Sequence, residues 1–267
     1  MSESAAKILI CAVESHAGFE MCVDLQVAVW GYSGGDIVPR RMFVLAQRIG
    51  GQVIGAFDGG RLVGFAMALP GYRKGCAYLH SHMVAVVSEY RNQGLGRRLK
   101  MAQYDDAMAR GFELMEWTFD PLEIKNAYLN IAKLGVICRR YEADFYGPST
   151  SPLQGGLPTD RLYAEWWLRS PRVGRHLGGG EVGERGGAER ILERISVPRA
   201  VEEWKRDASK RELAKALQEK NKDALESAFR RGLVVVGYER ESNGDGCFLL
   251  GPCDPCEGVP ASSEGWF

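Results

Sequence analysis

The sequence lacks a surplus of charge of either sign. Its 267 residues include 34 Lys and Arg against 34 Asp and Glu, so the formal net charge is zero. Proteins that bind nucleic acid or anionic membrane surfaces usually carry a basic surplus, which neutralises phosphate groups. The balance therefore predicts neither a nucleic-acid partner nor a membrane partner. An apolar content of 45% is typical of a globular protein.

Long apolar runs are also missing. No segment approaches the roughly 20 apolar residues that a membrane-spanning helix needs. The first residues lack the basic-then-apolar order of a secretory signal. The seven cysteines are scattered along the chain, which is typical of reduced thiols. We therefore expect a cytoplasmic protein.

A complete set of metal ligands is missing as well. Cys253 and Cys256 are two residues apart and Cys247 is nearby, but no histidine accompanies them. Because a tetrahedral zinc site needs four ligands, we predict no metal.

Two common phosphate-binding motifs are absent. No G-x-x-x-x-G-K-[ST] loop occurs, and Leu99 replaces the third glycine of a G-x-G-x-x-G motif. Instead, an apolar strand leads into the loop 91–96, RNQGLG, which opens a helical pattern. A helix N-terminus presents unpaired N–H groups at the positive end of the helix dipole, and glycines let a phosphate approach the backbone. The loop predicts a pyrophosphate site; the alternative is an ordinary strand-to-helix turn.

Apolar periodicity predicts alternating strands and helices around this loop. Strands are expected at 7–13, 52–57, 62–69, 77–87, 112–119, 136–146 and 161–168, and helices at 95–110 and 120–135. Asp120, Pro121 and Glu123 together form a capping signal for the second of these helices.

The segment VAVVSEYRNQGLGRRL and this order of elements resemble the GNAT (Gcn5-related N-acetyltransferase) superfamily over about residues 7–170. The stretch 117–135 further resembles a poorly characterised bacterial subgroup with a C-terminal extension. The resemblance implies an α/β fold, with a mixed, splayed central sheet flanked by helices and a smaller C-terminal α+β segment. The expected parts are a catalytic domain at 1–172, a glycine-rich linker at 173–188, the α+β segment at 189–252 and a disordered tail at 253–267.

The resemblance also implies acyl-CoA-dependent N-acyltransfer. Acetyl-CoA is the expected co-substrate, and a small-molecule amine such as an amino acid is the expected acceptor. In the family, the loop amides bind the pyrophosphate, while the preceding strand pairs with the pantetheine arm and presents an amide to the thioester oxygen. By match, the cofactor-binding residues are Val84, Ala85, Val86, Arg91, Asn92, Gln93, Gly94, Leu95, Gly96 and Arg97.

Acyl transfer to an amine needs a base. His80 and His82 lie two residues apart and therefore share one face of the strand. Imidazole titrates near neutral pH, and His82 is preferred because it lies nearer the thioester-binding segment. The alternative is that one or both are hydrogen-bonded core histidines.

Other polar candidates lie in and before the helix 120–135. Asp120 ends a strand, at an edge where ligands of open sheets often bind; its alternative role is the helix cap. Asn126 and Asn130 share a helix face and are candidates for binding the pantetheine arm or the acceptor, unless they are solvated polar residues. Where many GNAT enzymes have a proton-donating Tyr, this chain has Ile131, and Tyr128 is the substitute one turn earlier.

Several alternatives stay open. The function could be N-succinylation of amino acids, protein acetylation, or acyl-CoA binding by a non-catalytic regulatory module. No cysteine lies in the strand segment or the loop, and Cys76 precedes both, so direct transfer in a ternary complex is expected. The charged helical region 201–231 is a candidate homodimer contact. The basic residues of 97–100 are expected to meet the nucleotide charge and solvent.

Overall fold

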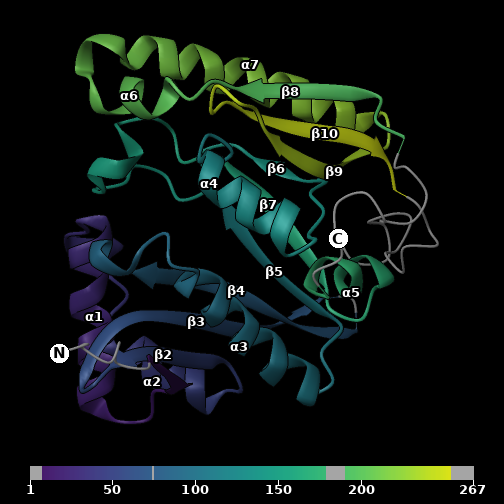
Figure 1. Ribbon diagram of the computed structural model, residues 1–267. Helices are drawn as coiled ribbons and strands as arrows, with labels where there is room; N and C mark the ends of the chain where they lie inside the picture. The colour runs from purple at the N-terminus through teal and green to yellow at the C-terminus, as the bar shows by residue number, and fades with distance from the viewer. Residues whose placement is uncertain (1–7, 74, 179–189, 254–267) are drawn as a thin grey trace, which may run out of the picture. The chain divides into compact units, whose positions relative to one another are not determined.

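The computed structural model describes residues 8–73, 75–178 and 190–253 (Figure 1). These residues divide into two compact units, Met1–Phe112 (unit 1) and Glu113–Phe267 (unit 2). Within the described ranges, no helix has both the length and the apolar character to span a membrane.

Unit 1 contains an antiparallel sheet in the order β1-β2-β3-β4 (Figure 1). Its elements are β1 (Leu9–Ala12), α1 (His16–Trp30), η1 (Gly34–Asp36), α2 (Arg40–Arg48), β2 (Gln52–Asp58), β3 (Arg61–Arg73), β4 (Cys76–Val86), η2 (Ser88–Tyr90) and α3 (Leu95–Ala109).

Helices cover both faces of this sheet. The Phe65 ring of β3 packs edge-on against Phe43 of α2, with 5.6 Å between ring centroids, and Phe43 stacks on Phe19 of α1. The neighbouring residue Gly64 faces the other way, where the side chain of Leu99 from α3 lies against it. Because successive strand residues point to opposite faces, α1 and α2 cover one face and α3 covers the other.

Unit 2 contains the strands β5, β7 and β6, paired in that order, and a second antiparallel sheet in the order β8-β10-β9. Its elements are β5 (Leu114–Phe119), α4 (Ile124–Ala127), the π-helical η3 (Tyr128–Lys133), β6 (Tyr141–Glu142), η4 (Pro152–Gln154), β7 (Arg161–Trp167), α5 (Pro171–Leu177), β8 (Glu193–Val197), α6 (Val201–Arg206), η5 (Ala208–Lys210), α7 (Arg211–Arg230), β9 (Leu233–Arg240) and β10 (Gly246–Pro252).

The C-terminal α+β segment forms one compact unit with the region that starts at β5. Cys138 and Val235 exchange two backbone hydrogen bonds of 2.8 and 3.2 Å. The Gln218 side chain of α7 donates to the Pro158 carbonyl at 2.9 Å. The predicted boundaries at 172 and 188 stay predictions. Residues 179–188 of the predicted linker and 254–267 of the predicted tail lie outside the described residues, and α5 occupies the start of that linker.

The predicted fold class is confirmed, since helices flank a sheet and a smaller α+β segment follows. The helix expected at 120–135 begins only at Ile124, because residues 120–123 form a turn in which Glu123 N donates to Asp120 O. The strand expected at 136–146 is wrong apart from 141–142. Ile137 bridges to β7 and Cys138 to β9, so the segment cannot follow a single partner strand.

Candidate functional site

The predicted site residues divide between the two units. In unit 1, strand β4 carries an extra residue at His82. Met83 pairs with Met67, whereas Ser81 pairs with Ala68, so His82 has no partner position on β3. Such a β-bulge re-aims side chains and is common next to active sites. The bulge lies directly before Val84, Ala85 and Val86, the segment predicted to bind the thioester arm.

His80 and His82 lie on the partly exposed face of β4, as the sequence predicts. Their ring centroids are 6.4 Å apart. Burial, together with the charge of His80, lowers the pKa of His82 to about 4. His82 is therefore uncharged at neutral pH, which is the form that can accept a proton.

The loop after β4 has the geometry of an anion site. Asn92 and Gly94 have positive φ angles of 61° and 77°. The first backbone hydrogen bond of α3 runs from Arg98 N to Gly94 O at 3.0 Å. The N–H groups of the helical residues before Arg98 have no carbonyl four residues earlier within the helix. A Cβ at Gly94 or Gly96 would meet nothing within 4 Å. The backbone of the loop is therefore open at Gly94 and Gly96, as close approach of a phosphate requires.

Side chains of the loop hold its shape. Arg91 Nε donates to Val86 O at 2.9 Å, which ties the loop to the end of β4. Gln93 Nε2 donates to Glu89 O at 2.8 Å. Leu95 is buried in the core of unit 1. Of the predicted cofactor-binding residues, these three therefore have structural contacts of their own, and their backbone is the part that could bind a ligand.

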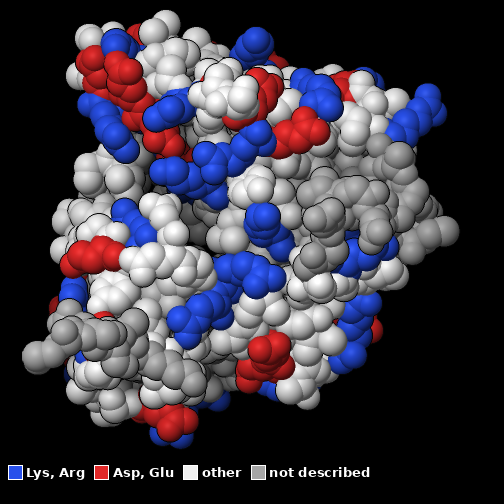
Figure 2. Space-filling model, in the orientation of Figure 1, with Lys and Arg blue, Asp and Glu red and all other residues white. Residues whose placement is uncertain are grey.

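The basic run at the start of α3 is not uniform. Figure 2 shows basic side chains over the first half of α3 and acidic ones further along it. Lys100, however, is buried, and its Nζ donates to Ser81 Oγ at 2.8 Å. Ser81 in turn donates to Gln103 at 2.8 Å. The expectation that Lys100 meets the nucleotide or solvent is wrong, because its side chain is buried and its ammonium group is hydrogen-bonded to Ser81.

Asp120 lies in unit 2, at the end of β5, and both of its carboxylate oxygens have partners. Oδ1 accepts from Leu122 N at 2.8 Å. Oδ2 accepts from Lys205 Nζ of α6 at 2.8 Å. Lys205 also contacts Glu123 Oε1 at 2.7 Å. Burial alone would lower the pKa of Lys205, but the two carboxylates raise it overall. Asp120 is thus a buried ion-pair partner, and its role as a base stays a prediction.

Replacing Asp120 by Asn tests these two roles. Removing one partner of a buried ion pair leaves a buried charge without compensation. Because Glu123 can still contact Lys205, we expect a loss of about 2 kcal/mol in the free energy of unfolding, measured by urea denaturation. The control is Glu203→Gln, whose pair with Lys210 is exposed, and it should leave the denaturation midpoint unchanged. A loss of acyl transfer in folded Asp120→Asn protein, without a loss of stability, would contradict the structural role.

Asn126 and Asn130 contact each other within unit 2. Asn130 is buried and its Nδ2 donates to Asn126 Oδ1 at 3.2 Å, while Asn126 is exposed. Only Asn126 therefore presents polar atoms at the surface. Ile131 is fully buried. Tyr128, the predicted substitute, is partly exposed, and the side-chain cations of Lys133 and Arg240 lie 5.3 and 5.7 Å from its ring centroid.

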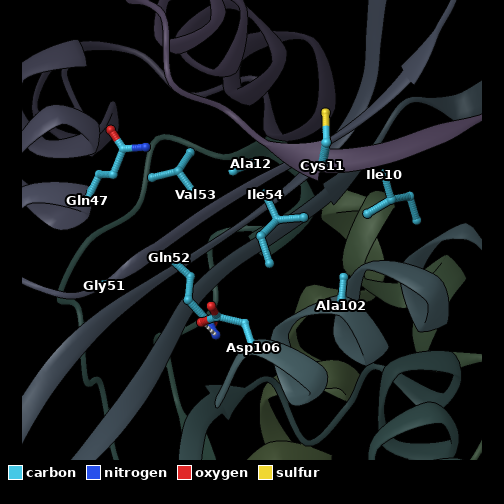
Figure 3. Close-up of a pocket in the computed structure, with 10 residues that line it drawn as sticks. All are labelled: Ile10, Cys11, Ala12, Gln47, Gly51, Gln52, Val53, Ile54, Ala102 and Asp106. Atoms are coloured by element: carbon cyan, nitrogen blue, oxygen red, sulfur yellow. Dashed lines mark hydrogen bonds between the residues drawn. The ribbon is translucent and has the colours of Figure 1, made fainter. Parts of the chain in front are cut away.

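A pocket of about 290 Å³ opens in unit 1 between β1, β2 and α3 (Figure 3). Its polar side chains include Gln52 and Asp106, which are joined by a hydrogen bond of 2.8 Å. Ile10, Ile54 and Ala102 contribute apolar surface. None of the predicted site residues lines this pocket. The described residues contain no group of three His, Cys, Asp or Glu side chains that could hold a metal ion.

Comparison with models of protein families finds one match, over part of the chain. Residues 20–127 match the model of the acetyltransferase (GNAT) family. A search of curated protein sequences finds no match.

Several solved structures of acetyltransferases have chains that are similar to part of this one. The ribosomal-protein-S18-alanine N-acetyltransferase from Escherichia coli is 17% identical with a TM-score of 0.49, over 61% of this chain and 94% of that chain. Aminoglycoside 6'-acetyltransferase type Ii is 20% identical with a TM-score of 0.47, over 60% and 97% of the two chains. A GNAT family acetyltransferase from Elizabethkingia anophelis, solved with acetyl-CoA bound, is 14% identical with a TM-score of 0.45, over 62% and 99%.

Proposed function

We propose that the protein is a GNAT acetyltransferase and that it transfers an acetyl group from acetyl-CoA to the amine of a small molecule. The match of residues 20–127 to the GNAT family model supports this proposal. An amino acid is the acceptor class that we favour. The cytoplasmic location, the homodimer and the subgroup with a C-terminal extension stay predictions.

The observation that carries this proposal is the open N-terminus of α3. Gly94 adopts a left-handed φ of 77° and, like Gly96, leaves its surroundings open. The N–H groups of Leu95, Gly96 and Arg97 precede the first helical hydrogen bond. A pyrophosphate placed there would accept several of them at the positive end of the helix dipole. Charge-assisted hydrogen bonds of this kind are about twice as strong as neutral ones.

In the proposed reaction, the amine nitrogen attacks the thioester carbon, a C–N bond forms and the C–S bond breaks. The amine proton passes to His82, directly or through water, and then to solvent. A backbone N–H of the segment 84–86 donates to the oxyanion. This step needs no particular side chain, because preorganised amides stabilise developing charge. The thiolate of CoA takes a proton from solvent.

Calorimetry with acetyl-CoA, succinyl-CoA and phenylacetyl-CoA tests the proposal. We expect at least acetyl-CoA to bind, and we expect turnover with an amine from a panel of amino acids and related metabolites. If no CoA ester binds, the proposal fails. Binding without turnover on any amine would favour a non-catalytic acyl-CoA-binding module. The buried Ile131, at the position where many GNAT enzymes have the proton-donating Tyr, is the observation that keeps this second candidate open.

A further inference from the structure

A short chain of buried hydrogen bonds lies next to the bulge of β4. Lys100 Nζ of α3 donates to Ser81 Oγ at 2.8 Å, and Ser81 Oγ donates to Gln103 Oε1 at 2.8 Å. Because a hydroxyl has a single proton to donate, the lysine nitrogen must be the donor in the first of these bonds. Ser81, Lys100 and Gln103 are all buried. We call these three residues the serine–lysine network.

The bulge decides which face of the sheet the Ser81 hydroxyl reaches. Ser81 pairs with Ala68, and Met83 pairs with Met67. Ala68 and Met67 are neighbours on β3 and therefore point to opposite faces, and side chains that pair directly share a face. Ser81 and Met83 consequently point to opposite faces, whereas residues two apart in a regular strand point to the same one. The extra residue His82 thus places Ser81 on the face that α3 covers.

Further hydrogen bonds fix the same part of α3 to β2. Gln52 of β2 is buried, and its Nε2 donates to Gln103 O at 2.9 Å and to Asp106 Oδ2 at 2.8 Å (Figure 3). Polar side chains therefore attach α3 to two strands of the sheet. Because α3 begins at the loop 91–96, these bonds connect the proposed phosphate site with the bulge, and all of them lie within unit 1.

The serine–lysine network is an unfavourable way to fill this space. A buried polar group lowers stability unless it is hydrogen-bonded, and a buried ammonium group lowers it more. Burial lowers the pKa of Lys100 well below its usual range. A methionine at position 100 would avoid this penalty. A buried polar group can, however, select one arrangement of the backbone, and apolar contacts alone specify the register of a bulged strand poorly.

We propose that Ser81 and Lys100 are positioning residues, which hold the bulge of β4 in register and so orient the imidazole of His82. Ser81 directly precedes His82, so the hydrogen bonds of its hydroxyl to α3 fix where the extra residue lies. A shift of the bulge by one position would turn the imidazole away from its present direction. This inference rests on the proposed function, in which His82 accepts the amine proton.

Ser81→Val and Ser81→Thr form a matched pair, because the two new side chains have nearly the same shape and only threonine keeps the hydroxyl. With acetyl-CoA and the best amine, Ser81→Val should lower kcat of the full-length protein about 10- to 100-fold. A misplaced base loses much of the roughly 100- to 10,000-fold that general base catalysis contributes. KM for acetyl-CoA should not change, and Ser81→Thr should keep most of kcat. Equal kcat values in the two variants would overturn the proposal.

Urea denaturation separates positioning from a role in stability alone. Ser81→Ala adds no volume, and it should lower the denaturation midpoint because Lys100 loses this hydrogen-bond acceptor. Adding Lys100→Met removes the buried ammonium group, so the midpoint of the double variant should return to the wild-type value or exceed it. We expect kcat to stay low in the double variant. A kcat that recovers together with the midpoint would contradict the positioning role.

NMR titration of the imidazole C–H protons tests the inference without turnover. In the wild type, burial and the charge of His80 lower the pKa of His82 to about 4. In Ser81→Val the ring should become more exposed, so its pKa should rise towards the usual value of about 6.5, whereas Ser81→Thr should keep the wild-type pKa. If no CoA ester binds, the proposed function fails, but this titration still tests the network. The same His82 pKa in all three proteins would show that the network does not position the ring.

Discussion

Gly94→Glu is expected to abolish acyl-CoA binding while the protein stays folded. Gly94 is the N-cap of α3, and its φ of 77° is a conformation that L-residues rarely adopt. A Cβ there meets no atom within 4 Å, so the substitution costs about 1–2 kcal/mol of backbone strain. The new carboxylate would repel a pyrophosphate and would itself accept hydrogen bonds from the helix N–H groups. We expect the Kd for acetyl-CoA to rise by about 100-fold or more, measured by calorimetry.

Two matched variants separate charge from strain. Gly94→Gln has nearly the same shape and the same backbone strain, but no charge, so it should weaken binding far less than Gly94→Glu. Gly96→Ala should weaken binding of acetyl-CoA far less than Gly94→Glu, because it adds one methyl group without charge and Gly96 has no positive φ. Equal affinity of Gly94→Glu and the wild type for acetyl-CoA would show that the phosphate does not bind at this helix end.

Most of unit 1 could be predicted because its signals are local. Ser15 caps α1, with its Oγ accepting from Gly18 N at 3.0 Å. The turn between β2 and β3 sits at Gly59, where the sequence shows Asp-Gly-Gly-Arg. The loop 91–96 leads into α3 at Leu95, as expected. The bulge at His82 could not be predicted, since it depends on the register between two strands and leaves no pattern in either one.

Unit 2 is less predictable because distant residues decide its local structure. Asp120 has the sequence position of a helix cap, and its Oδ1 accepts from Leu122 N, but its Oδ2 pairs with Lys205, 85 residues away. Segment 136–146 has apolar residues that suggest one strand, yet its two bridges connect to β7 and β9.

The apolar stripe of α3 predicted the buried face of that helix only in part. Leu95 and Leu99 are buried as expected, but Lys100 is buried as well. Burial lowers the pKa of Lys100 well below its usual range. A cluster of basic residues in the sequence does not show which of its lysines is solvated and which is buried. Lys100 is buried between the sheet and α3, where it donates to Ser81, which in turn donates to Gln103. The neighbouring Arg98 is exposed, which shows that one helical turn can hold both cases.

His82→Gln is expected to lower kcat about 100-fold, at the low end of the range for a general base. The affinity for acetyl-CoA should not change, since glutamine keeps the size and polarity of the side chain. The pH dependence gives a second test. With its pKa lowered to about 4, His82 is neutral through the range in which ordinary histidines titrate. The rate should therefore not fall through pH 6.5, and should be lost only as the pH approaches 4. A kcat that halves near pH 6.5 in the wild type, but not in His82→Gln, would contradict the lowered pKa.

The neighbouring His80 provides the control for this argument. Burial is the main cause of the lowered pKa of His82, and the charge of His80 adds to it. His80→Gln removes that repulsion, so the pKa of His82 should rise and the acid limb of the rate profile should shift to higher pH. NMR titration of the imidazole C–H protons measures the same shift without turnover. The free energy of unfolding should also depend on pH, because the pKa of His82 in the folded protein lies below the unfolded value of about 6.5. The contribution of neutral His82 to stability is present above pH 6.5 and is lost as the pH falls towards 4. An unchanged His82 pKa in His80→Gln would mean that burial alone sets it, and the two rings would then act independently.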